Sequence, residues 1–424
     1  MQQKIKFSTA AFIFAAVLAI SGCNDSSKDE VIVDPGVISD VPVTLTDDIR
    51  SRGFSADSDN TVFIFDVAKE QDQLDAKKVT TIESVDIRGS FNGWTLTSGF
   101  DMRASATDAG IWYLSLPNSS VAIPGNSGQP EFKFVVTGTV DGVAATAAWL
   151  DMSTTTPADY ITGGGDRNHI LVFPSDDMTQ VIANRDTANT VKTLAEFDLT
   201  SEADKQKISN FRLVPGTSKL FRSYHPFKKS RSQFDTEDTR VAQVQTYMQE
   251  KGVQSVITLY KDETAALDAT KNETISSYHQ ALIDAGHNLY LPDADYNTVY
   301  FSSDSAKFGG WIKQVVEFII SDANQAPVEI HCRLGTDRTG VFSAVIASLM
   351  GASWSDIVSD YQSSNNMAMK EFRDYKLLKY SFEKMLKVDL DDSSVNLQQE
   401  MTTYMISNGY LTQVQIDALV AKLK

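Results

Sequence analysis

The chain begins with a short apolar run behind a basic start. Phe12 to Ile20 reads FIFAAVLAI; it follows Lys4 and Lys6 and leads into Ser21-Gly22-Cys23. Spanning a bilayer takes about 20 apolar residues, so this run is too short to cross one. A basic start, a short apolar run and small residues are typical of an export signal. We therefore expect residues 1–22 to be a signal peptide.

The next segment, residues 23–57, has no hydrophobic periodicity and is rich in Asp, Ser, Pro and Val. That composition predicts a flexible tether. The ending Ile20-Ser21-Gly22-Cys23 resembles a bacterial lipobox. The resemblance implies cleavage before Cys23, lipidation of Cys23 and a lipid-anchored place in the cell envelope, periplasmic or surface-facing. The alternative is an export signal without lipidation and with an incidental cysteine.

From residue 58 to residue 175 the pattern changes to short alternating or β-branched runs separated by Gly, Asn and Pro. The runs are VFIFDV, VDIRGSF, GIWYLSL, EFKFVVTG and HILVF. Alternation with a period of two places apolar side chains on one face of a strand. The segment therefore predicts an all-β, immunoglobulin-like sandwich module.

The string VDIRGSFNGW, residues 85–94, and the later run EFKFVV, residues 131–136, resemble the glycogen-binding modules of AMP-activated kinase β subunits, branching enzymes and isoamylases. In that family two tryptophans stack on sugar rings, and a lysine and an asparagine bind hydroxyl groups. A flat indole covers the apolar face of a pyranose, while Lys and Asn supply directed hydrogen bonds. The resemblance implies a polysaccharide site at these matching positions: Trp94, Lys133, Trp149 and Asn168.

Two features of the sequence leave open whether this sugar site exists. An insertion over residues 139–147 separates Lys133 from Trp149 in the sequence. Tryptophans in small sandwiches are also often buried, so Trp94 and Trp112 could be core residues of a module that only packs on its neighbour.

Residues 176–204 are expected to form a linker, and residues 205–424 a second domain with an α/β pattern. Within it, the β-branched run VEI, residues 328–330, predicts a strand, and VFSAVIASLM, residues 341–350, predicts an apolar helix. The connecting loop reads HCRLGTDRTG. A strand, a tight loop and a helix N-terminus form an anion site, because backbone N–H groups point inward and the helix dipole adds positive potential.

This loop holds Cys332 and, six residues later, Arg338. A cysteine at a helix N-terminus can have its pKa lowered from about 8.5 to between about 3.5 and 7.5. A planar guanidinium can grip two phosphate oxygens. The alternative is a buried structural cysteine.

The loop resembles the H-C-x5-R-[ST]-G signature of cysteine-dependent phosphatases of the tyrosine and dual-specificity class. The resemblance implies phosphomonoester hydrolysis through a cysteinyl-phosphate, with no metal or cofactor. Cys332 is then the nucleophile and Arg338 the phosphate ligand. The other loop residues expected to bind substrate are Arg333, Leu334, Gly335, Thr336, Asp337 and Thr339.

Flanking segments extend the resemblance over residues 205–424. Asn210-Phe211-Arg212, Leu220-Phe221-Arg222-Ser223 and Asp360-Tyr361 with Ser364-Asn365 resemble segments of bacterial tyrosine/serine phosphatases. They imply the cysteine-phosphatase fold, a short, mostly parallel sheet flanked by helices.

The leaving oxygen needs a proton from a carboxylic acid. The segment LPDADY, residues 291–296, matches the family's position for that acid, and Asp295 is the favoured residue, with Asp293 close behind. Asp337 is a third candidate, because lipid phosphatases place an aspartate before the arginine; a solvated loop carboxylate is the alternative.

The composition of the chain limits the classes of partner that it can be expected to bind. The 424 residues carry a formal net charge of −17, which argues against a nucleic-acid partner. Two cysteines exclude a disulfide framework. The expected substrate is phosphotyrosine, and also phosphoserine or phosphothreonine, in a protein. The alternatives are a phosphoglucan or phosphoinositide phosphatase aided by the β-module and, from another class, a non-catalytic surface binding protein.

Overall fold

The computed structural model describes residues 40–154, 156, 167–260 and 275–424. The described residues all belong to one compact unit. Cys23 and the expected signal peptide lie outside the described residues, so lipidation and an envelope location stay predictions. Among the described residues, no helix combines the length and the apolar character needed to span a membrane.

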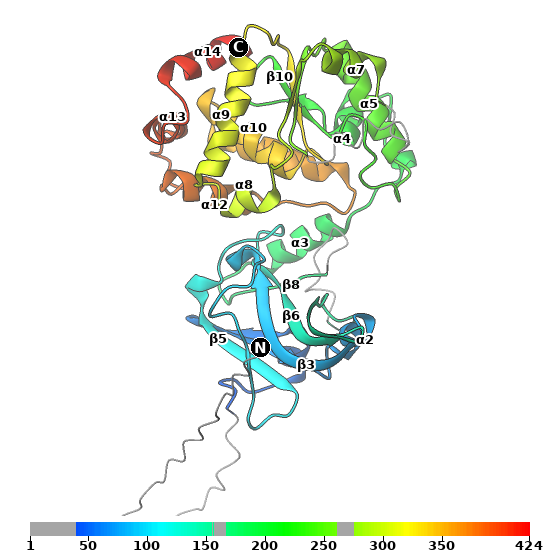
Figure 1. Ribbon diagram of the computed structural model, residues 1–424, viewed down its shortest axis with the longest axis vertical. Helices are drawn as coiled ribbons and strands as arrows, with labels where there is room; N and C mark the ends of the chain where they lie inside the picture. Colours follow the sequence, from blue (N-terminus) through cyan, green and yellow to red (C-terminus); the bar gives the residue numbers. More distant parts are fainter. Residues whose placement is uncertain (1–39, 155, 157–166, 261–274) are drawn as a thin grey trace, which may run out of the picture. The chain divides into compact units, whose positions relative to one another are not determined.

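The β-module consists of two antiparallel sheets (Figure 1). The first has the order β1 (Phe54–Ala56), β2 (Asn60–Asp66), β5 (Ile111–Pro117), β4 (Arg103–Ala104). The second has the order β3 (Val79–Gly89), β6 (Glu131–Val140), β7 (Val143–Trp149), and β8 (His169–Ile170) also pairs with β6. A short helix, α2 (Gln71–Ala76), precedes β3, and the short 3₁₀ turns Ser90–Asn92 and Asn118–Ser120 follow β3 and β5.

Aromatic residues join the two sheets. Phe63 of β2 meets Phe132 of β6 at 5.0 Å between ring centroids, and Phe65 meets Phe134 at 5.2 Å. All four rings are buried and belong to one core. The predicted packing of two β-sheets is therefore present, whereas the immunoglobulin-like strand order stays a prediction.

Ordered structure begins earlier than expected. α1 (Asp47–Arg52) is N-capped by Thr46, whose hydroxyl accepts a hydrogen bond from the Ile49 N–H. β1 follows it, and Phe54 of β1 is 1% exposed in the module core. The expected end of the tether at residue 57 is therefore too late, because this stretch contributes apolar side chains to the sandwich.

The segment expected to be a linker also contains helices. α3 (Met178–Asn189) starts at the N-cap Asp177, whose carboxylate accepts from two backbone N–H groups. A 3₁₀ turn (Leu194–Glu196) follows, and α4 (Glu202–Ser209) begins before residue 205. The polar sequence MTQVIANRDTAN has only a weak apolar face, so the hydrophobic pattern did not reveal α3.

The second domain is built on a five-stranded sheet. Its order is β12 (Asn288–Tyr290), β11 (Ser255–Thr258), β13 (Val328–His331), β10 (Leu220–Ser223), β9 (Arg212–Leu213). Four of these strands run parallel and β9 pairs antiparallel with β10. The predicted short, mostly parallel sheet is confirmed.

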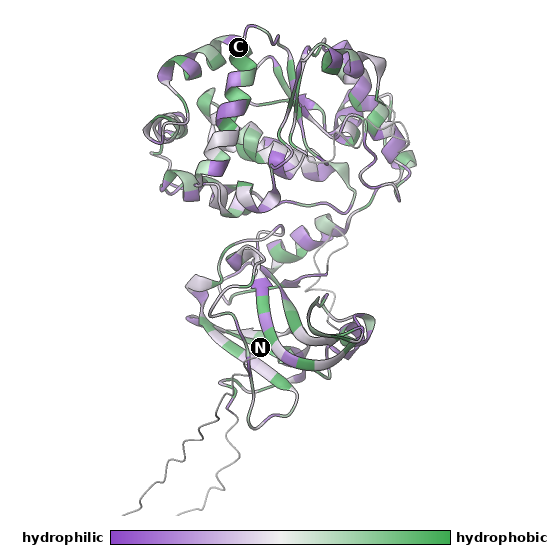
Figure 2. Cartoon of the chain, viewed as in Figure 1, coloured by the Kyte–Doolittle hydropathy of each residue, from purple (hydrophilic) through white to green (hydrophobic). Residues whose placement is uncertain are grey.

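Helices cover both faces of this sheet, with α5 and α7 on one side and α9 and α10 on the other in Figure 1. They carry both apolar and polar residues (Figure 2), so each has a face to bury. The remaining bounds are α5 (Glu237–Glu250), α7 (Ser277–Asp284), α8 (Tyr296–Phe301), α9 (Ala306–Ile320), α10 (Asp337–Leu349), α11 (Trp354–Ser363), a 3₁₀ turn (Ser364–Met367), α12 (Tyr375–Leu386), α13 (Leu397–Ser407) and α14 (Gln413–Leu423).

Candidate active site

The loop with the cysteine leaves the middle strand of the sheet. β13 lies between β11 and β10 and ends at His331, and α10 begins at Asp337. Cys332 is 3% exposed at the carboxyl end of that strand. The predicted strand, loop and helix are therefore present, and the loop leads into the N-terminus of a 13-residue helix.

Gly335 is required by the path of this loop. Its φ is +73°, and a Cβ at that position would lie 2.0 Å from the Ser223 carbonyl oxygen. Only glycine adopts this backbone region without strain, and no other residue leaves room for β10. The loop therefore packs its own backbone against the neighbouring strand.

Side chains from the flanking segments hold the loop carbonyls. Arg222 Nη2 donates a hydrogen bond to the Gly335 carbonyl at 2.6 Å. Asn210 Nδ2 donates to the carbonyls of Leu334 and Gly335, both at 3.2 Å. Because these hydrogen bonds hold the loop carbonyls pointing outward, the N–H groups of the loop stay available to bind an anion.

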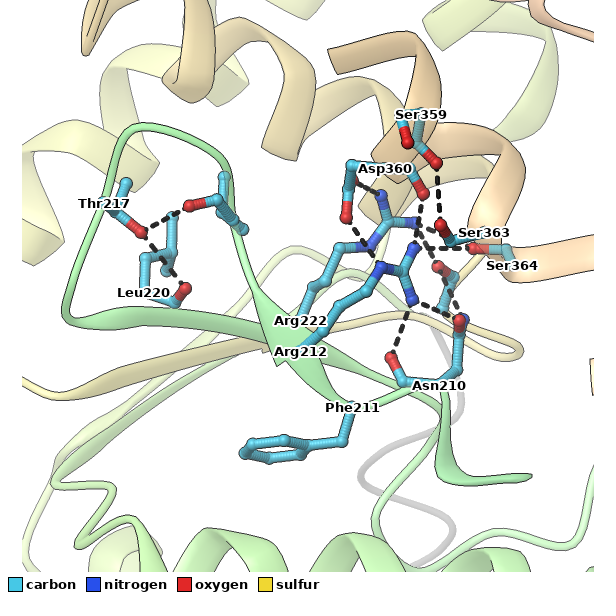
Figure 3. Close-up of polar contacts among 12 residues, drawn as sticks. Asn210, Phe211, Arg212, Thr217, Leu220, Arg222, Ser359, Asp360, Ser363 and Ser364 are labelled. Atoms are coloured by element: carbon cyan, nitrogen blue, oxygen red, sulfur yellow. Dashed lines mark hydrogen bonds and ion pairs between the residues drawn. The ribbon is translucent and has the colours of Figure 1, made fainter. Parts of the chain in front are cut away.

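Asp360 of α11 joins two of the supporting arginines (Figure 3). Its carboxylate accepts from Arg212 Nε at 2.6 Å and from Arg222 Nη1 at 2.5 Å. Burial would raise the pKa of Asp360, but the charges of Arg212 and Arg222 and their hydrogen bonds lower it below its ordinary value. The segments that resemble bacterial phosphatases thus form one charged network that supports the catalytic loop.

The thiol of Cys332 is poised to ionise. Burial would raise the pKa of Cys332, but the charge of Arg338 and the hydroxyl and backbone N–H of Thr339 lower it below its ordinary value. A thiolate is the nucleophilic form of cysteine. The site therefore favours the reactive form of Cys332 more than an unperturbed cysteine would.

Alkylation can test this pKa. The rate of inactivation by iodoacetamide is expected to rise with pH through a midpoint below about 8.5, the ordinary thiol value. Arg338→Gln should move the midpoint upward, because the positive charge that stabilises the thiolate is lost. The exposed Lys313→Gln on α9 is the control and should leave the midpoint in place. An unchanged midpoint in Arg338→Gln would contradict this account of the thiol.

Arg338 is held beside the cysteine by two contacts. Its guanidinium carbon lies 5.1 Å from the centre of the Tyr260 ring, and Nη1 donates to the Ala294 carbonyl at 3.2 Å. Stacking and one hydrogen bond leave other N–H groups of the guanidinium for a phosphate. The expected phosphate ligand is therefore positioned next to the nucleophile.

Cys332 and Arg338 open into a cavity of about 220 Å³. The catalytic domain supplies the other lining residues Ala188, Arg231, Arg333, Leu334, Asp337, Glu371, Phe372 and Arg373; the β-module supplies Asn126, Ser127, Glu131 and Asn168. Three other loop residues expected to bind substrate do not line this cavity. Thr336 and Thr339 are buried, and Gly335 packs on β10.

Asp295, which the sequence favours as the proton donor, has a structural role in the folded chain. It is the N-cap of α8, where its carboxylate accepts from the N–H and hydroxyl of Thr298, and it forms an ion pair with Lys307 at 3.1 Å. Burial would raise the pKa of Asp295, but Thr298 and Lys307 lower it below its ordinary value. Like Asp293, Asp295 lies outside the lining of the catalytic cavity. This arrangement favours a charged cap over a proton donor.

The other two candidates differ in their partners. Asp337 lines the cavity, but both its oxygens accept from Arg373, at 2.5 and 2.9 Å, and Tyr300 donates to it at 3.0 Å. Asp293 is exposed and has no hydrogen bond or ion pair with the described residues. The carboxyl of Asp293 is therefore the least committed of the three. Asp293 also directly precedes Ala294, whose carbonyl accepts a hydrogen bond from Arg338.

The residues expected to bind sugar gather around a second cavity, of about 470 Å³. Trp94, Lys133, Trp149 and Asn168 all line it, together with Asn126, Tyr296 and Arg373. The insertion did not displace Trp149, because it extends the hairpin of β6 and β7. Trp149 pairs with Val135 in register, and Lys133, two residues away, points to the same face.

The two tryptophans have different surroundings. Trp112 of β5 packs against the core of the module, whereas Trp94 packs against the core of the catalytic domain and also lines the second cavity. Trp94 has φ +60°, an uncommon conformation for a bulky residue, and it lies directly after the 3₁₀ turn Ser90–Asn92 and Gly93. Arg88 stacks over Trp149 at 4.9 Å, and Lys133 is paired with Asp151.

Three residues line both cavities: Asn126, Asn168 and Arg373. Four lining residues were not predicted from the sequence: Asn126, Glu131, Tyr296 and Arg373. Glu131 alone carried a signal, because alternation along β6 places it on the same face as Lys133. Asn126 and Arg373 come from loops and Tyr296 from α8, and only the folded chain brings Tyr296 and Arg373 to the β-module.

A cysteine in a phosphate-binding loop between a central parallel strand and a helix, with an arginine six residues on, defines a cysteine-dependent phosphatase. The model of the tyrosine phosphatase family matches residues 184–423. This match covers more than half of the chain, and the chain belongs to the tyrosine phosphatase family.

Similarity to individual proteins is weaker. The crystal structure of the core catalytic domain of the PP-IP phosphatase SIW14 from S. cerevisiae, in complex with citrate, is matched with 18% identity and a TM-score of 0.25. The match covers 48% of this chain and 94% of that chain. The comparison with curated proteins gives no match.

Proposed function

We propose that this cysteine-type phosphatase removes phosphate from a phosphorylated glycan, with an α-glucan as the reference substrate. One observation carries the proposal: the cavity lined by Trp94, Lys133 and Trp149 shares three wall residues with the cavity that holds Cys332. Tryptophan faces with adjacent amide and ammonium groups are suited to sugar rings and their hydroxyls. A sugar chain on these residues therefore lies within reach of the phosphate loop.

The proposed reaction has two displacements. The Cys332 thiolate attacks phosphorus, the bond to the sugar oxygen breaks, and a carboxylic acid protonates that oxygen. Arg338 and the loop N–H groups bind the other phosphate oxygens. Water then attacks the cysteinyl-phosphate, phosphate leaves, and the sulfur departs as a thiolate that Thr339 stabilises.

We propose Asp293 as the proton donor. It is exposed, it has no partner among the described residues, and it adjoins the Ala294 carbonyl that contacts Arg338. Asp295 and Asp337 are both engaged as carboxylates, the first by a helix terminus and a lysine, the second by Arg373. The lowered pKa of Asp295 makes it a poor acid.

Phosphotyrosine in a protein is the second candidate, with phosphoserine and phosphothreonine included. The family match favours it, since the matched model describes tyrosine phosphatases. A phosphopeptide offers the β-module cavity no sugar ring, however. This substrate therefore accounts for the catalytic loop and leaves the tryptophan-lined cavity without a task.

Trp149→Ala tests the glycan proposal. We expect KM for a phosphorylated maltodextrin to rise about tenfold, which corresponds to about 1.4 kcal/mol of lost stacking. Turnover of p-nitrophenyl phosphate should change much less, because this substrate reaches only the catalytic cavity. The comparison is made by steady-state kinetics on both substrates.

Trp112→Phe is the matched control, since Trp112 packs on the module core and lines neither cavity. It should leave KM for the maltodextrin close to the wild-type value. An unchanged KM in Trp149→Ala, or an equal loss on both substrates, would contradict the glycan proposal.

A further inference from the structure

The β-module contributes a carboxyl group to the catalytic cavity. Glu131, the first residue of β6, is 1% exposed and lines the cavity that holds Cys332. Its Oε1 accepts from the N–H and hydroxyl of Ser127 at 2.9 and 3.0 Å, and Oε2 accepts from Asn168 Nδ2 at 2.8 Å. A carboxylate can accept about four hydrogen bonds, so Oε2 keeps one free position among the described residues.

Glu131 is held firmly where it stands. A Cβ on Gly125 would lie 2.7 Å from its Cγ, so the turn before β6 closes over the side chain. Burial raises the pKa of Glu131, and the hydrogen bonds from Asn168 and Ser127 and the charge of Arg373 oppose that shift. A buried carboxyl with spare acceptor capacity gains from a ligand that donates to it.

Arg373 supplies the opposite half of a recognition pair. Its Nε and Nη2 bind the two oxygens of Asp337, Nη2 also pairs with Glu371 at 2.6 Å, and Nη1 donates to the Phe372 carbonyl at 2.6 Å. Of the five N–H groups of arginine, one on Nη1 therefore has no acceptor among the described residues. Arg373 lines both cavities, so a ligand in either can reach it.

Asn126 adds a second donor to the shared wall. Its Oδ1 accepts from the Tyr296 hydroxyl at 2.8 Å, and its backbone carbonyl accepts from the Asp374 N–H at 2.8 Å. These bonds fix the side chain and leave Nδ2 without an acceptor in the described part of the chain. The wall thus offers one acceptor and two donors in fixed positions.

We propose that Glu131 and Arg373 form a subsite for the hydroxyl groups of the sugar unit that carries the phosphate; this inference rests on the proposed function. A sugar hydroxyl accepts from Arg373 and donates to Glu131, because a hydroxyl does both. Asn126 binds a neighbouring hydroxyl.

This subsite explains how the enzyme distinguishes its substrates. A sugar phosphate satisfies the buried Glu131 and the free N–H groups, whereas an aryl phosphate or a phosphotyrosine side chain leaves them unpaired. Sites built to bind a hydroxyl group discriminate strongly against analogues that lack it. Glu131 and Arg373 are therefore specificity-determining residues, with Cys332 and Arg338 as the catalytic ones.

Glu131→Gln tests the subsite in the full chain, because glutamine keeps the size of the side chain and replaces one of the two acceptor oxygens with an NH2 donor. We expect the ratio of kcat/KM for a phosphorylated maltodextrin to kcat/KM for p-nitrophenyl phosphate to fall about tenfold, mainly through KM. Binding of the unphosphorylated maltodextrin, measured by calorimetry, should weaken as well. Glu83→Gln, an exposed glutamate of β3, is the matched control and should leave the ratio unchanged.

Two results would overturn the inference. The first is an unchanged ratio in Glu131→Gln. The second is a loss of kcat on aryl phosphates that grows with the pKa of the leaving group, which would make Glu131 the proton donor. If Glu131→Gln does not fold, Asn126→Ala gives the same test. An unchanged ratio in Asn126→Ala would contradict the claim that residues lining both cavities bind the sugar hydroxyls. A wild-type enzyme that hydrolyses p-nitrophenyl phosphate and leaves the phosphorylated maltodextrin intact would instead refute the proposed function.

Discussion

Replacing Cys332 with serine is expected to reduce the turnover of p-nitrophenyl phosphate to below about 1% of the wild-type value. The charge of Arg338 and the contacts with Thr339 lower the pKa of the thiol, which favours the thiolate in the wild-type enzyme. A serine hydroxyl stays protonated in the same place and is a weak nucleophile. Steady-state kinetics on the purified variant give the measurement.

The phosphate site should survive this substitution, because Arg338 and the loop N–H groups remain. Binding of inorganic phosphate, measured by calorimetry, and the melting temperature are therefore the controls for Cys332→Ser. Orthovanadate should inhibit the wild-type enzyme, and a chelator should leave it active. Activity retained in Cys332→Ser, or removed by a chelator, would contradict the cysteinyl-phosphate mechanism.

Asp293→Asn is expected to lower kcat by about 10²- to 10⁴-fold on substrates with poor leaving groups, the usual contribution of a positioned acid. Activated aryl phosphates should lose much less, since their leaving groups depart without a proton. The measurement is kcat across a series of aryl and alkyl phosphates with increasing leaving-group pKa.

Asp295→Asn is the matched comparison, because asparagine caps a helix about as well as aspartate. It should keep α8 folded and show no dependence on the leaving group. Asp337→Asn should lower activity on all substrates alike, because it breaks the pair with Arg373 beside the loop. A leaving-group-dependent loss in Asp295→Asn or Asp337→Asn, and none in Asp293→Asn, would show that the donor is assigned to the wrong residue.

The catalytic loop was predictable because its chemistry is contiguous in the sequence. Cys332, Gly335 and Arg338 lie within seven residues, between an apolar strand and an apolar helix. The structure confirms that strand and helix and shows why Gly335 is needed. Local patterns of this kind depend little on long-range packing.

The proton donor shows where the sequence pattern reaches its limit. The spacing around LPDADY favoured Asp295, but an aspartate directly before a helix also fits an N-cap. Only the folded chain brings Lys307 to its carboxylate. Sequence alone could not separate the two roles, because both place a carboxylate at the same position.

The boundaries of the β-module and the cavity residues Glu131 and Arg373 were not predictable from the sequence, for a different reason. α1 and α3 are short or polar, so their apolar periodicity is weak. Glu131 and Arg373 are more than 200 residues apart in the sequence, and no local signal links them. Their meeting depends on how the segment around Asp374 packs against the turn before β6, which hydrophobic patterning does not encode.

The most direct test of the central claim is a competition in one reaction mixture. The full-length enzyme is given a phosphorylated maltodextrin, a phosphotyrosine peptide and a phosphoinositide at equal concentrations, and the initial rates give the ratios of kcat/KM. We predict that the maltodextrin is dephosphorylated at least about tenfold faster than the other two, and that Trp149→Ala removes most of this preference. A preference for the peptide or the phosphoinositide, unaffected by Trp149→Ala, would contradict the claim that the two cavities form one glycan-phosphate site.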